Sequence, residues 1–123
     1  MLHGRLLAES LRVGADLTVE DLRLTRLGRH DESASTAGSQ PAVWTFVDFT
    51  APDERADELA AALAATLLPD DGWYADFEVG DEHVVVFAGR SFRYRRGDHA
   101  ARAEVVAYGR AAGTPEHQLD WGE

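Results

Sequence analysis

The stretch from Trp73 to Asp98, WYADFEVGDEHVVVFAGRSFRYRRGD, constrains the fold more than any other part of the chain. It holds six of the eleven aromatic residues and four of the twelve arginines. Its first seven residues alternate, which is the two-residue period of a half-buried strand, and Gly80-Asp81-Glu82 then suits a hairpin loop. Residues 83–87 return as a nearly all-apolar strand. The stretch therefore predicts the central antiparallel unit of the protein.

The course of the chain after Phe87 has two readings. Glycine at Gly89-Arg90 suits a tight two-residue hairpin, or it marks a bulge at which one long strand bends and continues. Continuation keeps the apolar residues on a single face without a change of register. We therefore favour one long, kinked strand, whose face would hold Val84, Val86, Ala88, Phe92 and Tyr94.

Elsewhere, the patterns predict two more strands, two helices and a short edge strand. Val43–Phe49 is apolar on both faces, which is typical of a strand inside a sheet. Thr50 and Asp53 resemble a capping box before the first helix, Pro69 ends that helix, and Asp98 suits the N-cap of the second. The remaining elements are expected at 22–30 (strand), 53–68 and 99–112 (helices) and 118–121 (edge strand).

The first 41 residues are less regular. LLAESLRVGADL reads as a short helix through Leu6, Leu7 and Leu11, or as a strand, and the two readings stay open for residues 5–20. Residues 30–41, HDESASTAGSQP, are polar and rich in Ser and Gly, which predicts a flexible loop.

The element order from residue 43 is strand, helix, strand, strand, helix, strand. This is the split βαβ order of a ferredoxin-like sandwich. The prediction is a single α+β domain over residues 1–123, with an antiparallel sheet of about five strands and two helices. Residues 42–123 would form the core, and 1–41 an N-terminal extension that adds a strand or covers the open face of the sheet.

Composition excludes several classes of function. The formal net charge is −10, which disfavours nucleic acid and membrane surfaces as partners of this acidic protein. There is no apolar run of eighteen residues, and charges interrupt the first twenty, so we expect a cytoplasmic protein. Cysteine and lysine are both absent, which excludes thiolate zinc sites and Schiff-base chemistry through a lysine amine.

Four arginines lie within seven residues, at Arg90, Arg93, Arg95 and Arg96. Because arginine stays protonated, this local positive patch would suit an anionic group. The aromatic residues would supply a pocket on the sheet, with a few charged groups to orient the ligand. The predicted ligand-binding residues are Trp44, Trp73, Tyr94, Arg90, Arg93 and Trp121.

Acid–base chemistry is the alternative, with Asp48 or Asp76 working alongside His83 or His117. Asp48 shares a strand face with Trp44, so that apolar surroundings would raise its pKa. The competing interpretation is that Asp48 caps the turn before Pro52. The histidines lack HxH or HxxxH spacing and no glycine-rich phosphate loop occurs, so neither a metal nor a cofactor is expected.

Three segments, GWYADF (72–77), VVFAGRSFRYRRGD (85–98) and YGRAAGTPEHQLDW (108–121), resemble those of a family of small uncharacterised actinobacterial proteins. The absence of Lys, Ile and Asn indicates a GC-rich genome, in agreement with this resemblance. The resemblance covers most of the chain from Pro41 and implies no activity, cofactor or catalytic residue.

The first functional hypothesis is therefore a small-molecule binding protein with an aromatic pocket and an arginine patch for an anionic group. The second is a metal-free acid–base enzyme of the isomerase, cyclase or decarboxylase type. The third is a protein-interaction module or homodimer, which would use its acidic surface or pair its sheets.

Overall fold

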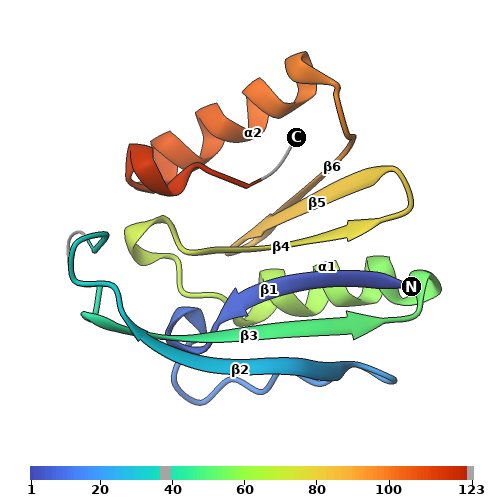
Figure 1. Cartoon of the computed structure of the whole chain (residues 1–123). Coiled ribbons are helices and arrows are strands. Elements are labelled where there is room, and N and C mark those ends of the chain that lie inside the picture. Colours follow the sequence, from blue (N-terminus) through green and yellow to red (C-terminus); the bar gives the residue numbers. More distant parts are fainter. Residues whose placement is uncertain (37–39, 122–123) are drawn as a thin grey trace.

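A computed structural model, which describes residues 1–36 and 40–121, contains one six-stranded antiparallel sheet and two helices (Figure 1). The strand order across the sheet is β2-β3-β1-β4-β5-β6. An α+β protein with an antiparallel sheet and two helices is thus confirmed, with six strands rather than about five. The strands are β1 (Leu2–Leu7), β2 (Arg23–Asp31), β3 (Val43–Ala51), β4 (Tyr74–Val79), β5 (Glu82–Phe87) and β6 (Arg90–Arg95), and the helices are α1 (Ala56–Thr66) and α2 (His99–Ala112).

The central antiparallel unit is confirmed, but its last part is a hairpin rather than a continuous strand. β4 and β5 pair across the turn at Gly80-Asp81, as predicted. A second two-residue turn at Ala88-Gly89 then joins β5 to β6, and Phe87 pairs with Arg90. Gly89 takes a φ of 74°, which glycine adopts without steric cost, and its N–H donates to the carbonyl of Ala64 in α1 at 2.9 Å. The favoured long strand is therefore wrong.

This turn changes which side chains share a face. Phe92 and Tyr94 pair with Val85 and His83, so they lie on the opposite face of the sheet from Val84.

The N-terminal segment lies at the centre of the sheet rather than beside it. β1 pairs with both β3 and β4 and runs antiparallel to each. β3 and β4 are consequently parallel to one another, and α1 connects them across the intervening β1. For residues 5–20 neither proposed reading describes the segment: β1 ends at Leu7, a 3-10 turn follows at Ala8–Ser10, and Leu11 makes an isolated bridge to Leu67.

The predicted ferredoxin-like order is not confirmed. The inserted strand of the split βαβ unit is the N-terminal β1, and no strand follows α2 in the described residues. The edge strand expected at 118–121 does not form, because Glu116–Gln118 is a 3-10 turn and residues 119–121 belong to no strand. We call residues 114–121 the C-terminal segment.

Helix α1 covers one face of the sheet and forms the main core. Its buried side chains Leu59 and Leu63 pack with Phe49 of β3 and Phe77 of β4, all at most 1% exposed. The predicted capping box is wrong, because Thr50 still belongs to β3 and no side chain caps the turn at Asp53–Arg55. The strand prediction for 43–49 is confirmed, since β3 pairs on both sides.

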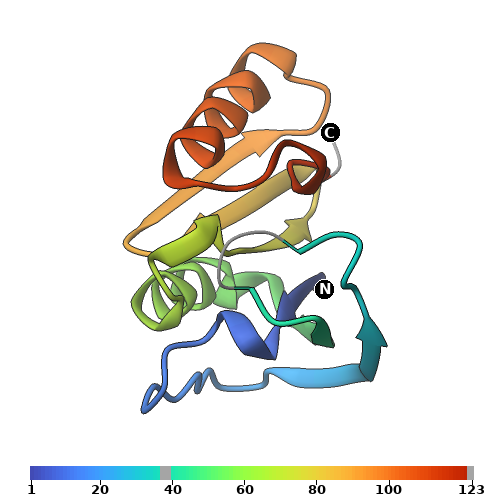
Figure 2. The same cartoon turned by 90° about the vertical axis from the view of Figure 1, so that its left-hand side faces the viewer.

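Helix α2 covers only part of the other face. Asp98 accepts a hydrogen bond from the N–H of Ala101, so the predicted N-cap is confirmed. A second core cluster lies under α2 and the C-terminal segment, over β5 and β6, and includes Val85, Phe87, Val105 and Trp121. On this face no helix of the described residues lies over β1, β2 and β3 (Figures 1 and 2). No helix among the described residues is long and apolar enough to span a membrane.

Candidate functional site

A groove of about 800 Å³ lies where the covered and the open parts of the sheet meet. Its floor is the face of β1, β3 and β4 that points away from α1. The C-terminal segment forms one wall, and the connection between β2 and β3 contributes the other. Figure 2 shows these two segments, in red and teal, on the same side of the molecule.

The floor of the groove follows from the pleat of the strands. In β1, Leu2 and Leu6 face α1, so His3 and Arg5 point to the other side. Arg5 is paired in register with Asp48 of β3 on one side and with Asp76 of β4 on the other. A row of charged side chains therefore crosses three adjacent strands.

Asp48 lies in an ion-pair network rather than in apolar surroundings. The Nε of Arg5 donates to its Oδ1 at 2.6 Å, and Arg26 of β2 approaches its other oxygen at 3.6 Å. The hydrogen bond from Arg5 lowers the pKa of Asp48, against a smaller opposing effect of burial. The predicted rise of this pKa is wrong, and the predicted cap of the turn before Pro52 is not what holds Asp48.

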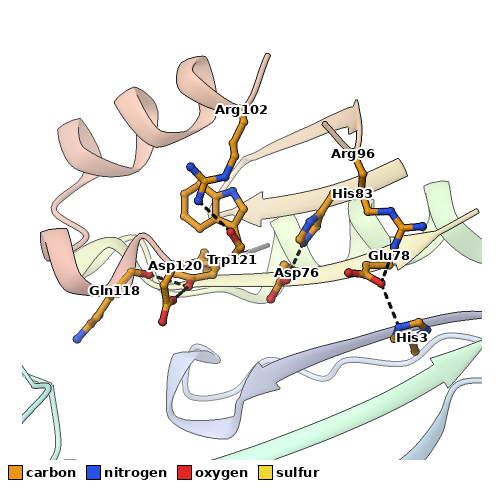
Figure 3. Close-up of polar contacts among 10 residues, drawn as sticks. His3, Asp76, Glu78, His83, Arg96, Arg102, Gln118, Asp120 and Trp121 are labelled. Carbon is orange, nitrogen blue, oxygen red and sulfur yellow. Dashed lines mark hydrogen bonds and ion pairs between the residues drawn. The ribbon is translucent and has the colours of Figure 1, made fainter. Parts of the chain in front are cut away.

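Asp76 and His83 form a direct pair on the neighbouring strands β4 and β5 (Figure 3). The Nε2 of His83 lies 2.8 Å from Oδ2 of Asp76. The imidazole is buried and stacks on Tyr94 with centroids 5.9 Å apart, and its Nδ1 has no hydrogen-bond partner in the described part of the chain. Of the predicted combinations of aspartate and histidine, this is the one that the structure brings into contact.

His117, the remaining catalytic candidate, lies in the wall of the groove. Its Nε2 is 2.8 Å from the carbonyl oxygen of Ser35, to which the amide of Gln118 also donates. These contacts fasten the C-terminal segment to the connection between β2 and β3. The predicted flexible loop at 30–41 is held at this point; its residues 37–39 lie outside the described ranges.

All three tryptophans of the chain line the groove. Trp44 and Trp73 meet edge to face with centroids 5.8 Å apart, at one end. Trp121 meets Tyr74 in the same way at 4.9 Å, beside the C-terminal segment. The structure thus gathers three of the predicted ligand-binding residues around a single cavity.

The other predicted ligand-binding residues do not line this groove. Tyr94 is buried beneath α2. Arg93 lies on the α1 face, where it pairs with Glu82 at 2.9 Å and approaches Asp57 of α1 at 3.4 Å. Arg90 lies over the ring of Phe92 at 4.5 Å.

The rest of the arginine cluster is also engaged within the fold. Arg95 pairs with Asp81 at 3.2 Å, and Arg96 with Glu78 at 3.1 Å. The cluster therefore compensates carboxylates on adjacent elements.

The sequence predictions missed several residues of the groove, among them Arg5 and Asp120. Residues 2–7, LHGRLL, alternate with Leu2 and Leu6 opposite Arg5, and that period would have indicated a strand. Asp120 had no such signal, because the C-terminal segment is irregular. Its Oδ1 lies 3.1 Å from the hydroxyl of Tyr74, which also donates to the carbonyl of Gln118 at 2.7 Å.

Comparisons of this chain with protein-family models, with curated proteins and with solved structures give no match. They leave the resemblance to the actinobacterial family untested. Among the described residues, no three His, Cys, Asp or Glu side chains gather in a way that would hold a metal ion.

Proposed function

We propose that the protein binds a small organic molecule in the groove between β1, β3, β4 and the C-terminal segment. The observation that carries this proposal is the cavity itself. Its volume of about 800 Å³ falls within the range of about 300–1,000 Å³ typical of ligand sites. Aromatic side chains from three separate segments line it, as is common in ligand sites, together with six charged side chains among the described residues, which is more than such sites usually carry.

The walls of the groove support the proposal further. An open antiparallel sheet is expected to carry polar side chains toward solvent, so the charged row alone needs no ligand. The contacts of His117 and Gln118 with Ser35, however, hold two segments over the sheet more than 80 residues apart in sequence. These segments turn a flat face into a concave one.

Tryptophan fluorescence provides a direct test, because every tryptophan of the chain lines the groove. Titration with a panel of small metabolites should give a saturable change in emission for at least one compound. Phe46→Ala removes a half-buried ring from the floor, and we expect it to weaken that binding by about five- to tenfold, the cost of one lost apolar contact.

Arg93→Ala is the matched control, since Arg93 lies on the other face of the sheet. We expect it to leave the affinity unchanged. If Arg93→Ala weakened binding as much as Phe46→Ala, the site would lie elsewhere, and a panel without any saturable compound would contradict the proposal.

The Asp76–His83 pair favours a second candidate, a metal-free acid–base enzyme. Asp76 lines the groove and would accept or return a proton from a bound substrate, while the buried His83 holds the carboxylate in place through its Nε2. Asp48 is a poor general acid, because Arg5 keeps its carboxylate ionised.

A screen for isomerase, cyclase and decarboxylase turnover would test this candidate. Asp76→Asn should abolish any activity found, and Asp48→Asn should retain a large part of it. Full turnover in Asp76→Asn would contradict the assignment of Asp76 as the base.

A further inference from the structure

We propose that the groove selects an organic cation, an amine or quaternary ammonium group joined to an apolar body. This inference rests on the proposed function and names the ligand class. Among the described residues, five carboxylates line the groove, at Glu32, Asp48, Asp76, Glu78 and Asp120, against a single guanidinium, that of Arg5. The groove is therefore negative, which reverses the expectation of an anionic ligand.

Two of these five carboxylates have an arginine within ion-pair distance, and the other three, Glu32, Asp76 and Asp120, have none in the described ranges. Arg5 neutralises Asp48 at 2.6 Å, and Arg96 pairs with Glu78 at 3.1 Å. The contacts of Asp76 and Asp120 are the ring of His83 and the hydroxyl of Tyr74. Asp120 therefore has no cationic side chain within ion-pair distance in the described ranges, whereas Asp76 has the imidazole of His83 at 2.8 Å and is also attracted to Arg5, its neighbour in register.

These two carboxylates act on the same place, the hydroxyl of Tyr74. Burial is the main reason that the pKa of Tyr74 is raised, and the charges of Asp120 and Asp76 raise it further. An ammonium group beside this hydroxyl would lie next to Asp120 and would also be attracted by the charge of Asp76, in a partly enclosed site where charges are less screened than in water.

The aromatic lining suits the same ligand class. Trp121 lies edge to face with Tyr74 at 4.9 Å, so two rings lie next to Asp120. Ammonium groups are attracted to aromatic faces, and Trp121 already receives one cation, since the Cζ of Arg102 lies 5.7 Å from its ring centroid. An anion would be repelled here, and Arg90 and Arg93, the arginines predicted to receive it, lie outside the groove.

A matched series of ligands tests the inference on the full-length protein. Phenethylamine, 2-phenylethanol and 3-phenylpropanoate share a phenyl ring and differ in charge. Tryptophan emission, excited where a phenyl ring does not absorb, reports each titration. We expect the amine to bind about tenfold more tightly than the alcohol, from one ion pair and one cation–π contact, and the carboxylate to bind most weakly.

Substitutions of single carboxylates test which residues cause the preference for the amine over the alcohol. Asp120→Asn and Asp76→Asn should each reduce the preference for amine over alcohol by about three- to tenfold, with little change in alcohol affinity. Asp120→Asn is the cleaner change, because it leaves the Asp76–His83 pair intact. Glu104→Gln, an exposed position on α2, removes the same charge outside the groove and should preserve the preference.

The outcomes separate this inference from the proposed function. Equal or tighter binding of the alcohol or the carboxylate overturns the cation preference and leaves a binding groove. A preference that survives both Asp120→Asn and Asp76→Asn also overturns it. Saturable binding by none of the three ligands, at concentrations up to the millimolar range, contradicts both proposals.

Discussion

The two halves of the sheet differ in what covers them. β5 and β6 are covered by α1 on one face and by α2 with the C-terminal segment on the other, whereas β2, β3 and β1 are open on the groove side. Under α2 the side chains on this face are apolar, as at Val85 and Phe87. On the open half, the equivalent positions carry the ion pair of Arg5 and Asp48.

β4 lies at the boundary, and its side chains are partly covered like those of β5 and partly open like those of β1. Tyr74 packs under the C-terminal segment, while Asp76 lines the groove. Coverage by a second layer therefore decides which half serves stability and which remains available for chemistry. Candidate ligand contacts gather where one half gives way to the other.

The largest difference between the halves should appear on truncating one phenylalanine in each. Phe87 is 2% exposed and contacts the rings of Tyr108 and Trp121, so Phe87→Ala should lower the free energy of unfolding by about 3–5 kcal/mol. Phe46 lies half-buried on the open half, and Phe46→Ala should cost less, about 1–2 kcal/mol, since part of its ring stays in contact with water. Urea denaturation followed by circular dichroism measures both.

Similar losses of unfolding free energy in Phe87→Ala and Phe46→Ala would contradict the difference between the covered and the open half. That result would mean that the open half is also covered, for example by a second copy of the chain. Sedimentation of the wild-type protein would then identify the covering molecule.

Two strand glycines test a second contrast, between the centre and the edge of the sheet, at the level of the backbone. A Cβ added at Gly4 would lie 2.3 Å from the carbonyl oxygen of Asp76 and 2.4 Å from Cβ of Phe77, so β1 approaches β4 too closely for a side chain. Gly4→Ala should therefore lower the free energy of unfolding by about 1–3 kcal/mol.

Gly28, on the edge strand β2, is the matched control. A Cβ there would meet only the flexible ends of His30 at 3.2 Å and Arg26 at 3.3 Å. Gly28→Ala should change stability by less than about 0.5 kcal/mol. Thermal melts of the two variants give the difference, and an equal loss at both positions would mean that the edge is as tightly packed as the centre.

The sequence predicted the elements whose cause is local. The β4–β5 hairpin, the helix 99–112 and its cap at Asp98 all follow from neighbouring residues, and the structure confirms them. The place of β1 depends on partners far along the chain, since Arg5 pairs with a residue 43 positions away. No local pattern specifies that insertion, and the predicted strand order failed there.

The candidate site shows the same limit. Arginine clustering near residue 93 indicated a patch, but Arg93 lies near Asp57, which is 36 positions away on a helix. The three tryptophans line one groove in the structure, because burial brings large rings together wherever they occur in the chain. The pKa of Asp48 was predicted from Trp44, which shares its strand face. That prediction did not include Arg5, which lies on the neighbouring strand β1.

The ion pair of Arg5 and Asp48 causes the smallest of the three predicted effects, a dependence of the free energy of unfolding on pH. Because the folded pKa of Asp48 is lowered, the ionised carboxylate stabilises the folded state above the unfolded pKa. This contribution disappears as the pH falls through the folded pKa. Asp48→Asn should therefore be less stable than the wild type by about 0.5–1 kcal/mol at neutral pH, the usual value for an exposed ion pair.

Denaturation of both proteins at a series of pH values measures this gap. It should close in acid and shrink in high salt, which screens exposed charges. Glu104→Gln on α2 is the control for loss of charge alone. A gap that widened in acid would mean that the folded state holds Asp48 protonated, as a buried carboxyl would be. The open half would then resemble the covered one, and the contrast between them would not hold.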